Sequence, residues 1–542
     1  EPSTPVIAGD QTAVQTYRET IKSIEQVHRQ SASGSQVLAK ITAATDSLLV
    51  DLLSDTAQEL GLDSTQLADQ MCLVALGGYG RKEMHPHSDI DVMFLFPDKP
   101  DKQAENLVSR ILHALYDARL QIGNVTRDFA AAREIARDDL QSLTAMLEGR
   151  LIWGNLQQYE TFFGQLSAIV RKNRKQLIAG KVRERQERIA RYGNTINIQE
   201  PNLKDSPGSL RDYHHGIWLA SFMRARKMNL AEMSRVGLLL DREYRDLQKA
   251  LEFSWRIRTE LHLITGKKSD HLQMYLHQQL ANQLGFQDEN GRLAEEILMR
   301  EYFRRALAIQ EFADRMSELA TPKPFWRRVF HRVQVVDLGD GFRLRGGEID
   351  IPRDLHFFEN SPQRILDAFL HMIHTRASFS PFAITAIHEN RNLIDADFVK
   401  DEESVGKIRM IFQYPGRIVP ALRVMRRQGI LHRLFPEWRE IANLVRHDLH
   451  HRYTVDEHTL LALEYLETLE EDDLEFSAER LALWSTLGCR DLLRIATLYH
   501  DIGKGRGGDH CEIGAELVDR IAEILRLSEQ DRADLHFLVL RH

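Results

Sequence analysis

Two neighbouring stretches decide how this chain folds and what it binds: GGYGR at residues 77–81 and SDIDVMFLF at residues 88–96. A short apolar run over residues 72–76 leads into the first stretch and predicts a buried strand that ends in a glycine turn. The second stretch places two aspartates at the head of another apolar run, which Pro97 ends. A strand, a glycine turn and a second strand headed by carboxylates can hold a nucleoside triphosphate together with its metal ions.

Asp89 and Asp91 are the predicted catalytic and metal-binding residues of this first centre. Successive side chains of a strand point to opposite faces, so both carboxylates share one face while Ile90 and Val92 point into the core. Carboxylate oxygens suit hard cations such as Mg²⁺ or Mn²⁺. Two such ions can activate an attacking oxygen and stabilise a departing pyrophosphate. The pair therefore predicts nucleotidyl transfer.

Residues around the aspartates are predicted to bind the nucleotide. Glycines let backbone N–H groups approach the phosphates without a Cβ in the way. Basic side chains after the turn can offset the charge of the triphosphate, and a serine hydroxyl can donate to a phosphate. The residues with these roles are Gly77, Gly78, Arg81 with its neighbour Lys82, and Ser88.

The whole combination carries this prediction, because an Asp-x-Asp alone is also typical of a solvated hairpin. Strand, Gly-Gly, ten intervening residues and then the aspartates resemble the nucleotidyltransferase signature of the DNA polymerase-β superfamily. That superfamily often uses a third carboxylate on a later strand. Asp128 and Asp139 are the candidates here, but neither lies in a clear motif, so the role stays open.

The bulk composition limits the class of protein. The chain has 542 residues, 43% of them apolar, and a net charge of −8, which argues mildly against nonspecific nucleic-acid binding without excluding a local basic groove. No apolar run approaches the roughly 20 residues that cross a membrane. Three cysteines without a CxxC pair suit a reducing cytosol. We therefore expect a cytoplasmic protein without a membrane partner.

The hydrophobic periodicity predicts a predominantly helical α+β protein. Its parts are expected to be a polymerase-β-like nucleotidyltransferase domain, a helical domain and an all-α domain rich in histidine. The predicted boundaries are a flexible segment over 1–35, the nucleotidyltransferase domain over 36–160, a helical domain over 161–325, a small β-hairpin with a helical connector over 326–440, and the histidine-rich domain over 441–542.

The second centre lies near the end of the chain, where residues 441–542 hold eight of the 23 histidines. The most informative piece is HDIGK at 500–504, in which His500 and Asp501 follow an apolar helix and form half of a mixed N/O metal site. His458 begins another helix and is a third candidate ligand; His510 is a candidate for a second ion or a phosphate. Lys504 and Arg506 are candidates to bind an anionic substrate, and His447, His450, His451 and His536 are expected to be structural.

This second centre resembles the HD superfamily of metal-dependent phosphohydrolases. The ligands of that superfamily are a first His, the His-Asp pair and a final Asp on a later helix. The resemblance implies a divalent metal held by His458, His500 and Asp501. Three aspartates, namely Asp519, Asp531 and Asp534, lie earlier than the superfamily's spacing suggests. The final Asp therefore has no convincing counterpart, and the site is expected to be incomplete.

The two centres together resemble the family of bifunctional PII uridylyltransferases/uridylyl-removing enzymes. The resemblance extends through nearly the whole chain from Gly77. It is carried by GGYGRKEMHPHSDIDVMFLF at 77–96, EPNLKDSPGSLRD at 200–212, WRIRTELHLITGKKSDHL at 255–272, HDLHHRYTVDEHTL at 447–460 and HDIGKGRGGDH at 500–510.

The resemblance implies an activity and partners. The first domain would transfer UMP from UTP to a tyrosine of the nitrogen-regulatory PII protein, and the HD domain would hydrolyse the UMP–tyrosine bond. In the family, glutamine favours removal and is sensed by ACT domains after the HD domain; none follows here, which puts a glutamine response in doubt. In the loop 200–212, Lys204 and Arg211 are predicted to contact the triphosphate or base, with surface salt bridges as an equal alternative.

Two departures and two alternatives remain. The family usually has Gly-His-Ser-Val-Arg where this chain has GNVTR at 123–127, and a GPGGLRD-like segment where it has SPGSLRD at 206–212. Some tRNA nucleotidyltransferases also join a polymerase-β-like head to an HD domain, although the acidic net charge and the YTVDEHT stretch argue against an RNA substrate. A non-catalytic nucleotide sensor is the other alternative, against which the intact aspartates and the His-Asp pair argue.

Overall fold

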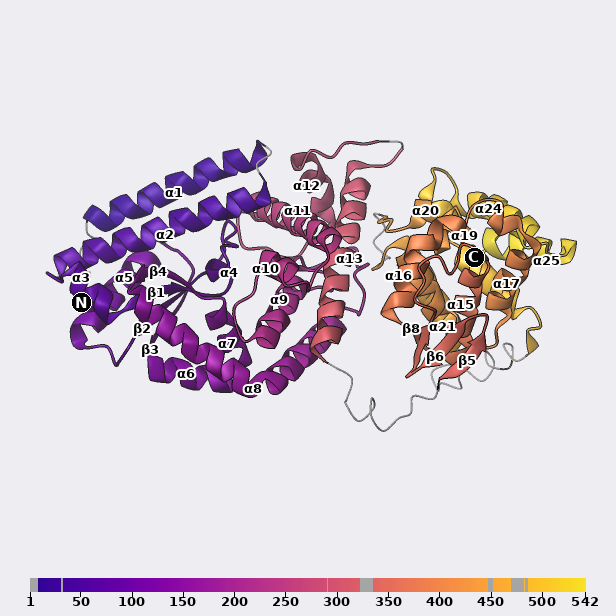
Figure 1. Cartoon of the computed structure of the whole chain (residues 1–542). Helices are drawn as coiled ribbons and strands as arrows, with labels where there is room; N and C mark the ends of the chain where they lie inside the picture. Colours follow the sequence, from indigo (N-terminus) through magenta and orange to yellow (C-terminus); the bar gives the residue numbers. More distant parts are fainter. Residues whose placement is uncertain are drawn as a thin grey trace. The chain divides into compact units, whose positions relative to one another are not determined.

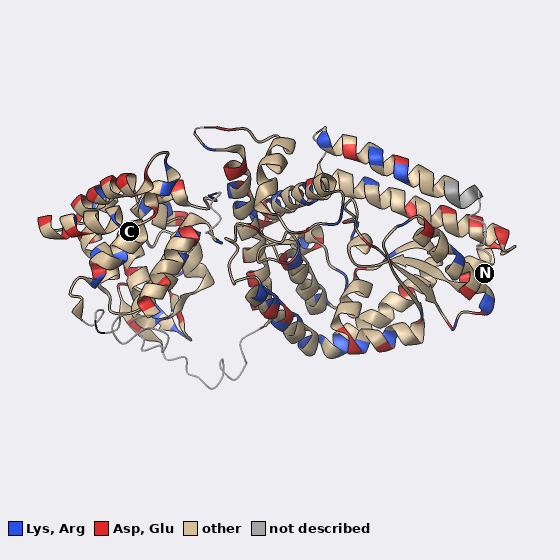
Figure 2. Ribbon diagram, turned by 180° about the vertical axis from the view of Figure 1, so that it is seen from behind, with Lys and Arg blue, Asp and Glu red and all other residues tan. Residues whose placement is uncertain are grey.

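The computed structural model describes the chain except for residues 1–7, 31–32, 290, 322–334, 447–451, 469–481 and 483–485. The chain forms two compact units, Glu1–Pro322 and Lys323–His542 (Figure 1). Most of the described residues are helical and two small sheets accompany them, which confirms the predicted α+β class. Among these residues, no helix is both long enough and apolar enough to span a bilayer. Lys and Arg residues are interspersed with Asp and Glu residues along the helices of both units (Figure 2).

The first unit contains one four-stranded sheet in the order β3-β2-β1-β4. Strands β2 and β3 run parallel, and the other pairs are antiparallel. The strands are β1 (Cys72–Ala75), β2 (Ile90–Phe96), β3 (Ile122–Asp128) and β4 (Arg150–Gly154). The helices are α1 (Ala8–Arg29), α2 (Gly34–Glu59), α3 (Ser64–Gln70), α4 (Gly77–Gly80), α5 (Lys102–Asp117), α6 (Phe129–Asp138), α7 (Leu140–Leu147), α8 (Leu156–Arg191), α9 (Leu210–Arg224), α10 (Leu230–Arg235), α11 (Asp241–Thr265), α12 (His277–Gln283) and α13 (Ala294–Ala320), with a 3-10 turn η1 (Met274–Leu276).

Both faces of this sheet are covered, because its strands alternate between two cores. Val92 and Phe94 of β2 pack with residues of α2 and α5, whereas Met93 and Leu95 pack with residues of α6, α7 and α8. Figure 1 shows these two groups of helices on opposite sides of the sheet. Asp91 shares the face of Met93, since residues two apart in a strand point the same way. The strand pattern therefore aims the carboxylate toward the helical part of the same unit.

Helix α1 occupies most of the segment that the sequence predicted to be flexible. Its buried residues Val14 and Ile24 belong to the core that α2 also lines, and Arg18 donates a hydrogen bond to the carbonyl of Ala118. Ser33 caps the following helix and forms a capping box with Gln36. The prediction of flexibility over 1–35 was wrong for these residues, because the polar composition hides an apolar stripe that packs on α2.

A buried ion-pair cluster joins α8 to α9. Asp212 is fully buried; it accepts hydrogen bonds from Arg185 at 2.9 Å and from Arg188, and from the backbone N–H of Gly208 at 2.8 Å. Gly208 has φ +71°, and a Cβ there would lie 2.4 Å from the carbonyl oxygen of Ala306. The cluster thereby fixes the irregular segment before α9, which the sequence predicted as an interruption between helices.

The second unit contains a four-stranded sheet in the order β5-β6-β7-β8 and a helical remainder. The predicted hairpin is present as β5 and β6, but two further short strands extend it, and residues 333–334 of the predicted first strand lie outside the described residues. The strands are β5 (Val336–Gly339), β6 (Phe342–Arg345), β7 (Glu348–Asp350) and β8 (Ser378–Phe379). The helices are α15 (Arg364–Thr375), α16 (Pro381–Asn390), α17 (Glu402–Gln413), α18 (Val419–Gln428), α19 (Leu431–Leu434), α20 (Trp438–Ile441), α21 (Val455–Thr468), α23 (Arg490–Tyr499), α24 (His510–Ile524) and α25 (Glu529–Leu540), with 3-10 turns η2 (Arg391–Leu393), η3 (Phe398–Lys400) and η4 (Ile502–Gly505).

We expect Asp212→Ala to destabilise the first unit by about 3–5 kcal/mol, because it leaves two buried guanidinium groups without their shared carboxylate. Chemical denaturation followed by tryptophan fluorescence and circular dichroism measures the change. The matched control is Asp246→Ala, which removes an exposed i,i+4 partner of Arg242 and should cost less than about 1 kcal/mol. Equal losses for the two variants would contradict the structural role of the cluster.

Candidate functional site

The Asp91 carboxylate lies in a slot between two glycines. Gly123 of β3 is its partner in the parallel pair with β2, and a Cβ at Gly123 would lie 2.3 Å from Asp91 Oδ1. Gly77, at the start of α4, has φ +51°, and its Cβ would lie 3.4 Å from Asp91 Oδ2. A side chain at Gly123 would therefore displace the carboxylate. The sequence analysis noticed the GNVTR stretch but missed the role of its glycine, which only the strand register reveals.

The charges around the aspartates are unequal. Burial, and then the nearby Asp89, raise the pKa of the Asp91 carboxyl, while Lys268, Lys204 and Arg81 oppose the rise. Lys268 Nζ contacts Asp89 Oδ2 at 2.5 Å. Two carboxylates held close together in this way attract cations, as expected for a metal site.

Helix α11 holds the turn that precedes Asp89. His85 forms a hydrogen bond of 3.0 Å with the hydroxyl of Thr259, and His262 donates to the carbonyl of Pro86. Ser88 Oγ accepts the backbone N–H of His85 at 3.1 Å, which leaves its hydroxyl hydrogen available to donate. The stretch 255–272 thus supports the site through residues that the sequence analysis quoted without assigning a role.

Arg81 lies beside the site, but its guanidinium is already engaged. It donates to Glu83 at 2.7 Å and to Glu148 at 2.5 Å, and Glu148 also accepts the indole N–H of Trp218. Although burial opposes it, the charges of Glu148 and Glu83 raise the pKa of Arg81. Burial would raise the pKa of Glu83, but Arg81 and His214 lower it to about 2. This network holds the glycine turn in place, so Arg81 has little charge left for a phosphate.

Lys204 and Arg211 come from the irregular segment before α9 and from its first turn. Asn202 Oδ1 accepts the backbone N–H of Lys204 at 3.0 Å, and Arg211 contacts Asp205 at 3.3 Å. Burial, followed by repulsion from Arg211 and Arg258, lowers the pKa of Lys204. Within the described part of the chain, no carboxylate lies at ion-pair distance from Lys204 Nζ. Its charge is therefore available to an anion, while that of Arg211 is partly matched.

These residues line one cavity of about 420 Å³ inside the first unit. A cavity of this size lies within the range of small-molecule sites. Its lining includes Gly77, Gly78, Arg81, Ser88, Asp89, Asp91, Lys204 and Arg211 among the predicted residues, and Lys181, Glu184, Tyr192, His214, Trp218, Arg258 and Lys268 among those that the sequence analysis did not predict. The carboxylates of Asp89 and Asp91 fit Mg²⁺, and the ammonium and guanidinium groups of the same lining fit a phosphate chain.

Three sequence candidates lie away from this cavity. Asp128 and Asp139 are the N-caps of α6 and α7, where their carboxylates accept backbone N–H groups. Lys82 is exposed and does not line the cavity. On β3, the position opposite Asp91 is Gly123, so this strand supplies no third carboxylate there.

In the second unit, His458, His500 and Asp501 meet as the sequence predicted. His500 Nε2 lies 3.2 Å and His458 Nε2 3.7 Å from Asp501 Oδ2. His500 Nδ1 donates to the carbonyl of Thr497 at 2.8 Å, which leaves Nε2 as the free ligand atom. Burial would raise the pKa of Asp501, but His500 and Lys504 lower it well below its usual range. An ionised carboxylate and two imidazole nitrogens fit a divalent metal.

Buried ion pairs fix the helix that carries His458. Glu457 accepts from Arg423 at 2.6 Å and contacts Arg426 at 2.7 Å, and Asp456 contacts Arg426 at 3.3 Å. Both acidic residues are buried, so α18 orients the start of α21 and with it the imidazole. The YTVDEHT stretch therefore combines one candidate ligand with the two side chains that position it.

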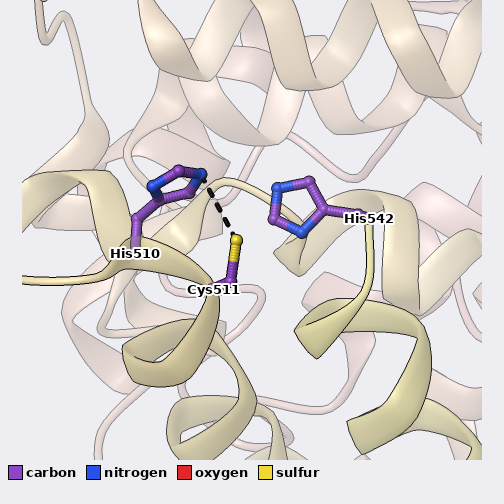
Figure 3. Close-up of side chains that lie close together, drawn as sticks. All are labelled: His510, Cys511 and His542. Carbon is purple, nitrogen blue, oxygen red and sulfur yellow. Dashed lines mark hydrogen bonds between the residues drawn. The ribbon is translucent and has the colours of Figure 1, made fainter.

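A second cluster lies beside the first and consists of His510, Cys511 and His542 (Figure 3). Cys511 Sγ lies 3.6 Å from His510 Nε2, and His542 Nε2 lies 3.7 Å from Asp501 Oδ1. Asp501 thus faces both clusters with its two oxygens. The sequence analysis named His510 but missed Cys511 and His542, because only the packing of α25 against α24 brings the latter close.

The other candidates of the second unit form ion pairs or hydrogen bonds within the protein, or lie outside the described residues. Lys504 pairs with Asp501 at 2.8 Å, whereas Arg506 pairs with Glu440 at 2.7 Å. Asp519 pairs with Arg532 and His536, the Asp531 carboxylate accepts from the hydroxyl of Ser528 at the start of α25, and Asp534 accepts from Gln530. Within the described part of the chain, none of these three aspartates joins either cluster. His447, His450 and His451 lie outside the described residues.

Four family models match the chain. They are described as GlnD PII-uridylyltransferase over residues 176–317, uridylyltransferase GlnD third domain over 342–434, putative nucleotidyltransferase over 18–124 and HD domain over 455–542. The matches run in the order of the two centres. Most of the helical region and most of the small sheet fall within the two matches described as GlnD segments.

Curated relatives agree with these matches. A protein of Novosphingobium aromaticivorans is 31% identical over 88% of this chain and 52% of its own length, and one of Bordetella avium is 34% identical over 95% and 58%. A protein of Vibrio cholerae is 31% identical over 93% and 57%. Each is named a bifunctional uridylyltransferase/uridylyl-removing enzyme. The chain spans somewhat more than half the length of the curated relatives it matches. It belongs to the GlnD-type family of bifunctional uridylyltransferase/uridylyl-removing enzymes.

Proposed function

We propose that this chain transfers UMP from UTP to a tyrosine hydroxyl of a PII signalling protein and hydrolyses the same bond at its HD centre. The observation that carries the proposal is the cavity in which the Asp89–Asp91 pair faces Lys204, together with the separate His458–His500–Asp501 cluster in the other unit. The relatives' printed names support UMP transfer and removal. The net charge of −8 argues mildly against an RNA substrate.

In the transfer reaction, the phenolic oxygen attacks the α-phosphorus of UTP. A bond forms between these two atoms, the bond from the α-phosphorus to the bridging oxygen breaks, pyrophosphate leaves, and the phenolic proton is released. Asp89 and Asp91 would hold Mg²⁺ or Mn²⁺, which supplies charge neutralisation for both the attacking and the leaving oxygen. The backbone of Gly77 and Gly78, the hydroxyl of Ser88 and the ammonium of Lys204 bind the phosphates, and Arg211 contacts the rim of the same cavity.

In the removal reaction, water attacks the phosphorus of the UMP–tyrosine bond, and the tyrosine oxygen leaves with a proton. His458, His500 and Asp501 would hold a divalent metal, which makes the attacking water acidic enough to ionise near neutral pH. His510, with Cys511 and His542, would hold a second ion next to the first, since Asp501 faces both clusters. Lys504 stabilises the Asp501 carboxylate in this arrangement.

The division of labour follows the predicted domain boundaries. We assign transfer to residues 36–160 with the helical domain 161–325, the connector role to 326–440 and hydrolysis to 441–542. The family matches over 18–124, 176–317, 342–434 and 455–542 support this assignment. UTP and a PII protein are the proposed partners, glutamine is the proposed effector, and the cytoplasm is the proposed location.

Incubation with α-labelled UTP and either a PII protein or tRNA tests the acceptor. We expect label on the PII protein, at a tyrosine identified by peptide mass spectrometry, because the relatives are named for this modification. Label on tRNA alone, or tight UTP binding without turnover on either acceptor, would contradict the proposal. Parallel reactions with ATP and CTP measure the preference for the base.

Asp89→Asn combined with Asp91→Asn should reduce transfer by at least about a thousandfold, because the carboxylates that hold the metal are lost. Hydrolysis of pre-modified PII protein should stay within about twofold of the unaltered chain, since the HD cluster lies in the other unit. The control is Asp98→Asn with Asp117→Asn, which neutralises two exposed carboxylates of the same unit and should leave both activities intact. Loss of both activities in the site variant would show that the two centres are not separate.

His500→Ala combined with Asp501→Ala should abolish hydrolysis and leave transfer intact, because two of the three ligands of the first HD cluster are removed. Release of labelled UMP from modified PII protein measures hydrolysis. His356→Ala with Asp354→Ala is the matched control, since both side chains are exposed and lie in the same unit. A site variant that still releases UMP at the original rate would refute the assignment of this cluster.

A further inference from the structure

Lys268, which lies in the 255–272 stretch but was assigned no role there, forms an ion pair at the candidate transferase carboxylates. Lys268 Nζ lies 2.5 Å from Asp89 Oδ2, the outer of the two carboxylates. Both side chains are about one-third exposed, so neither is locked in place by burial. The lysine belongs to the segment after α11, which the left-handed Gly266 (φ +63°) separates from the helix. An ammonium therefore occupies the immediate surroundings of an oxygen that would bind a metal ion.

An ammonium and a divalent cation cannot both lie against the same carboxylate without repulsion. Asp91 adds to the attraction for either cation, since its carboxylate lies in the same cavity and no cationic side chain of the described residues is at ion-pair distance from it. Metal binding at the aspartates therefore requires Lys268 to move away from Asp89. An exposed ion pair of this kind breaks at low cost.

The backbone around Lys268 is held while its side chain is not. On one side, α11 is fixed to the turn before Asp89 by the pairs His85–Thr259 and His262–Pro86. On the other, the backbone carbonyl of Asp270 accepts the N–H of Leu203, the residue next to Lys204. The backbone of Lys268 is thus held between the turn before Asp89 and the segment that carries Lys204. Both lysines line the same cavity.

We propose that Lys268 is a positioning residue whose ammonium changes partner. It pairs with the carboxylate of Asp89 while the site holds no nucleotide, and it pairs with the phosphate chain when the metal–nucleotide complex binds. The proposal rests on the transferase function proposed above. It implies that the free metal binds the aspartates weakly, because Lys268 competes with it. It also implies that metal and nucleotide bind cooperatively, because the triphosphate provides the lysine with a new partner.

Lys268→Met tests the proposal through two affinities, which are expected to change in opposite directions. In the background His500→Ala with Asp501→Ala, Mn²⁺ binding without nucleotide is measured by electron paramagnetic resonance, and the signal of the Asp89→Asn with Asp91→Asn variant is subtracted. We expect Mn²⁺ to bind about fivefold more tightly to Lys268→Met. Binding of UTP with Mg²⁺, measured by calorimetry, should weaken about tenfold, since a charged contact to phosphate is lost.

Two further variants sharpen the test. Lys267→Met removes the neighbouring exposed lysine, which does not line the cavity, and should change neither affinity. Lys268→Arg keeps the charge and should keep Mn²⁺ binding weak. Unchanged Mn²⁺ affinity in Lys268→Met overturns the counter-cation role, and unchanged UTP affinity overturns the phosphate contact. Neither measurement needs an acceptor protein, so a chain that failed to modify PII protein would still give a clear result for Lys268.

Discussion

The close approach of two strands and a turn around Asp91 is the constraint on which the transferase centre depends. The carboxylate has room because Gly123 on β3 carries no side chain toward it, and Gly77 in the turn borders it on the other side. The register of the parallel pair β2–β3 places Gly123 opposite Asp91. The alternation of β2 points the Asp91 side chain away from the core that α2 and α5 line. A packed sheet thereby offers a charged group to the cavity without burying it among apolar side chains, where an unpaired charge would be costly.

Charges around this cavity fall into two groups with different tasks. The buried ones are matched within the protein: Arg81 with Glu83 and Glu148, and Asp212 with two arginines of α8. These side chains are engaged with one another and hold the glycine turn and the loop before α9 in place. Lys204 and Lys268 lie in the cavity with less complete partners, so they carry the charge that a triphosphate would meet.

The HD centre follows a similar logic with different elements. Its ligand candidates come from α21, from the end of α23, from the start of α24 and from the residues after α25. Glu457 and Asp456 lock the start of α21 to α18, and the carbonyl of Thr497 fixes the tautomer of His500. Asp501 lies close to members of two neighbouring clusters, so its single carboxylate charge would act on cations held at either of them.

The sequence by itself determined the fold class, the strands that flank the glycine turn and the candidate ligands Asp89, Asp91, His458, His500 and Asp501. These features are local: strand alternation, a glycine turn and a helix that ends in His-Asp are visible in short windows. Tertiary structure alone decided which charges remain available. Arg81 was a reasonable phosphate ligand by sequence, yet Glu148, 67 residues away, engages it.

The same holds for groups that sequence reasoning missed. Gly123, Lys268 and His542 reach their sites through strand register, a helix from another part of the unit and the packing of α25, respectively. The apolar residues of α1 likewise become part of a core only because α2 packs against them. Contacts between residues far apart in the chain depend on how whole elements pack, and no local pattern encodes that packing. Local sequence patterns could therefore predict the candidate residues, whereas the tertiary structure determined which side chains contact them.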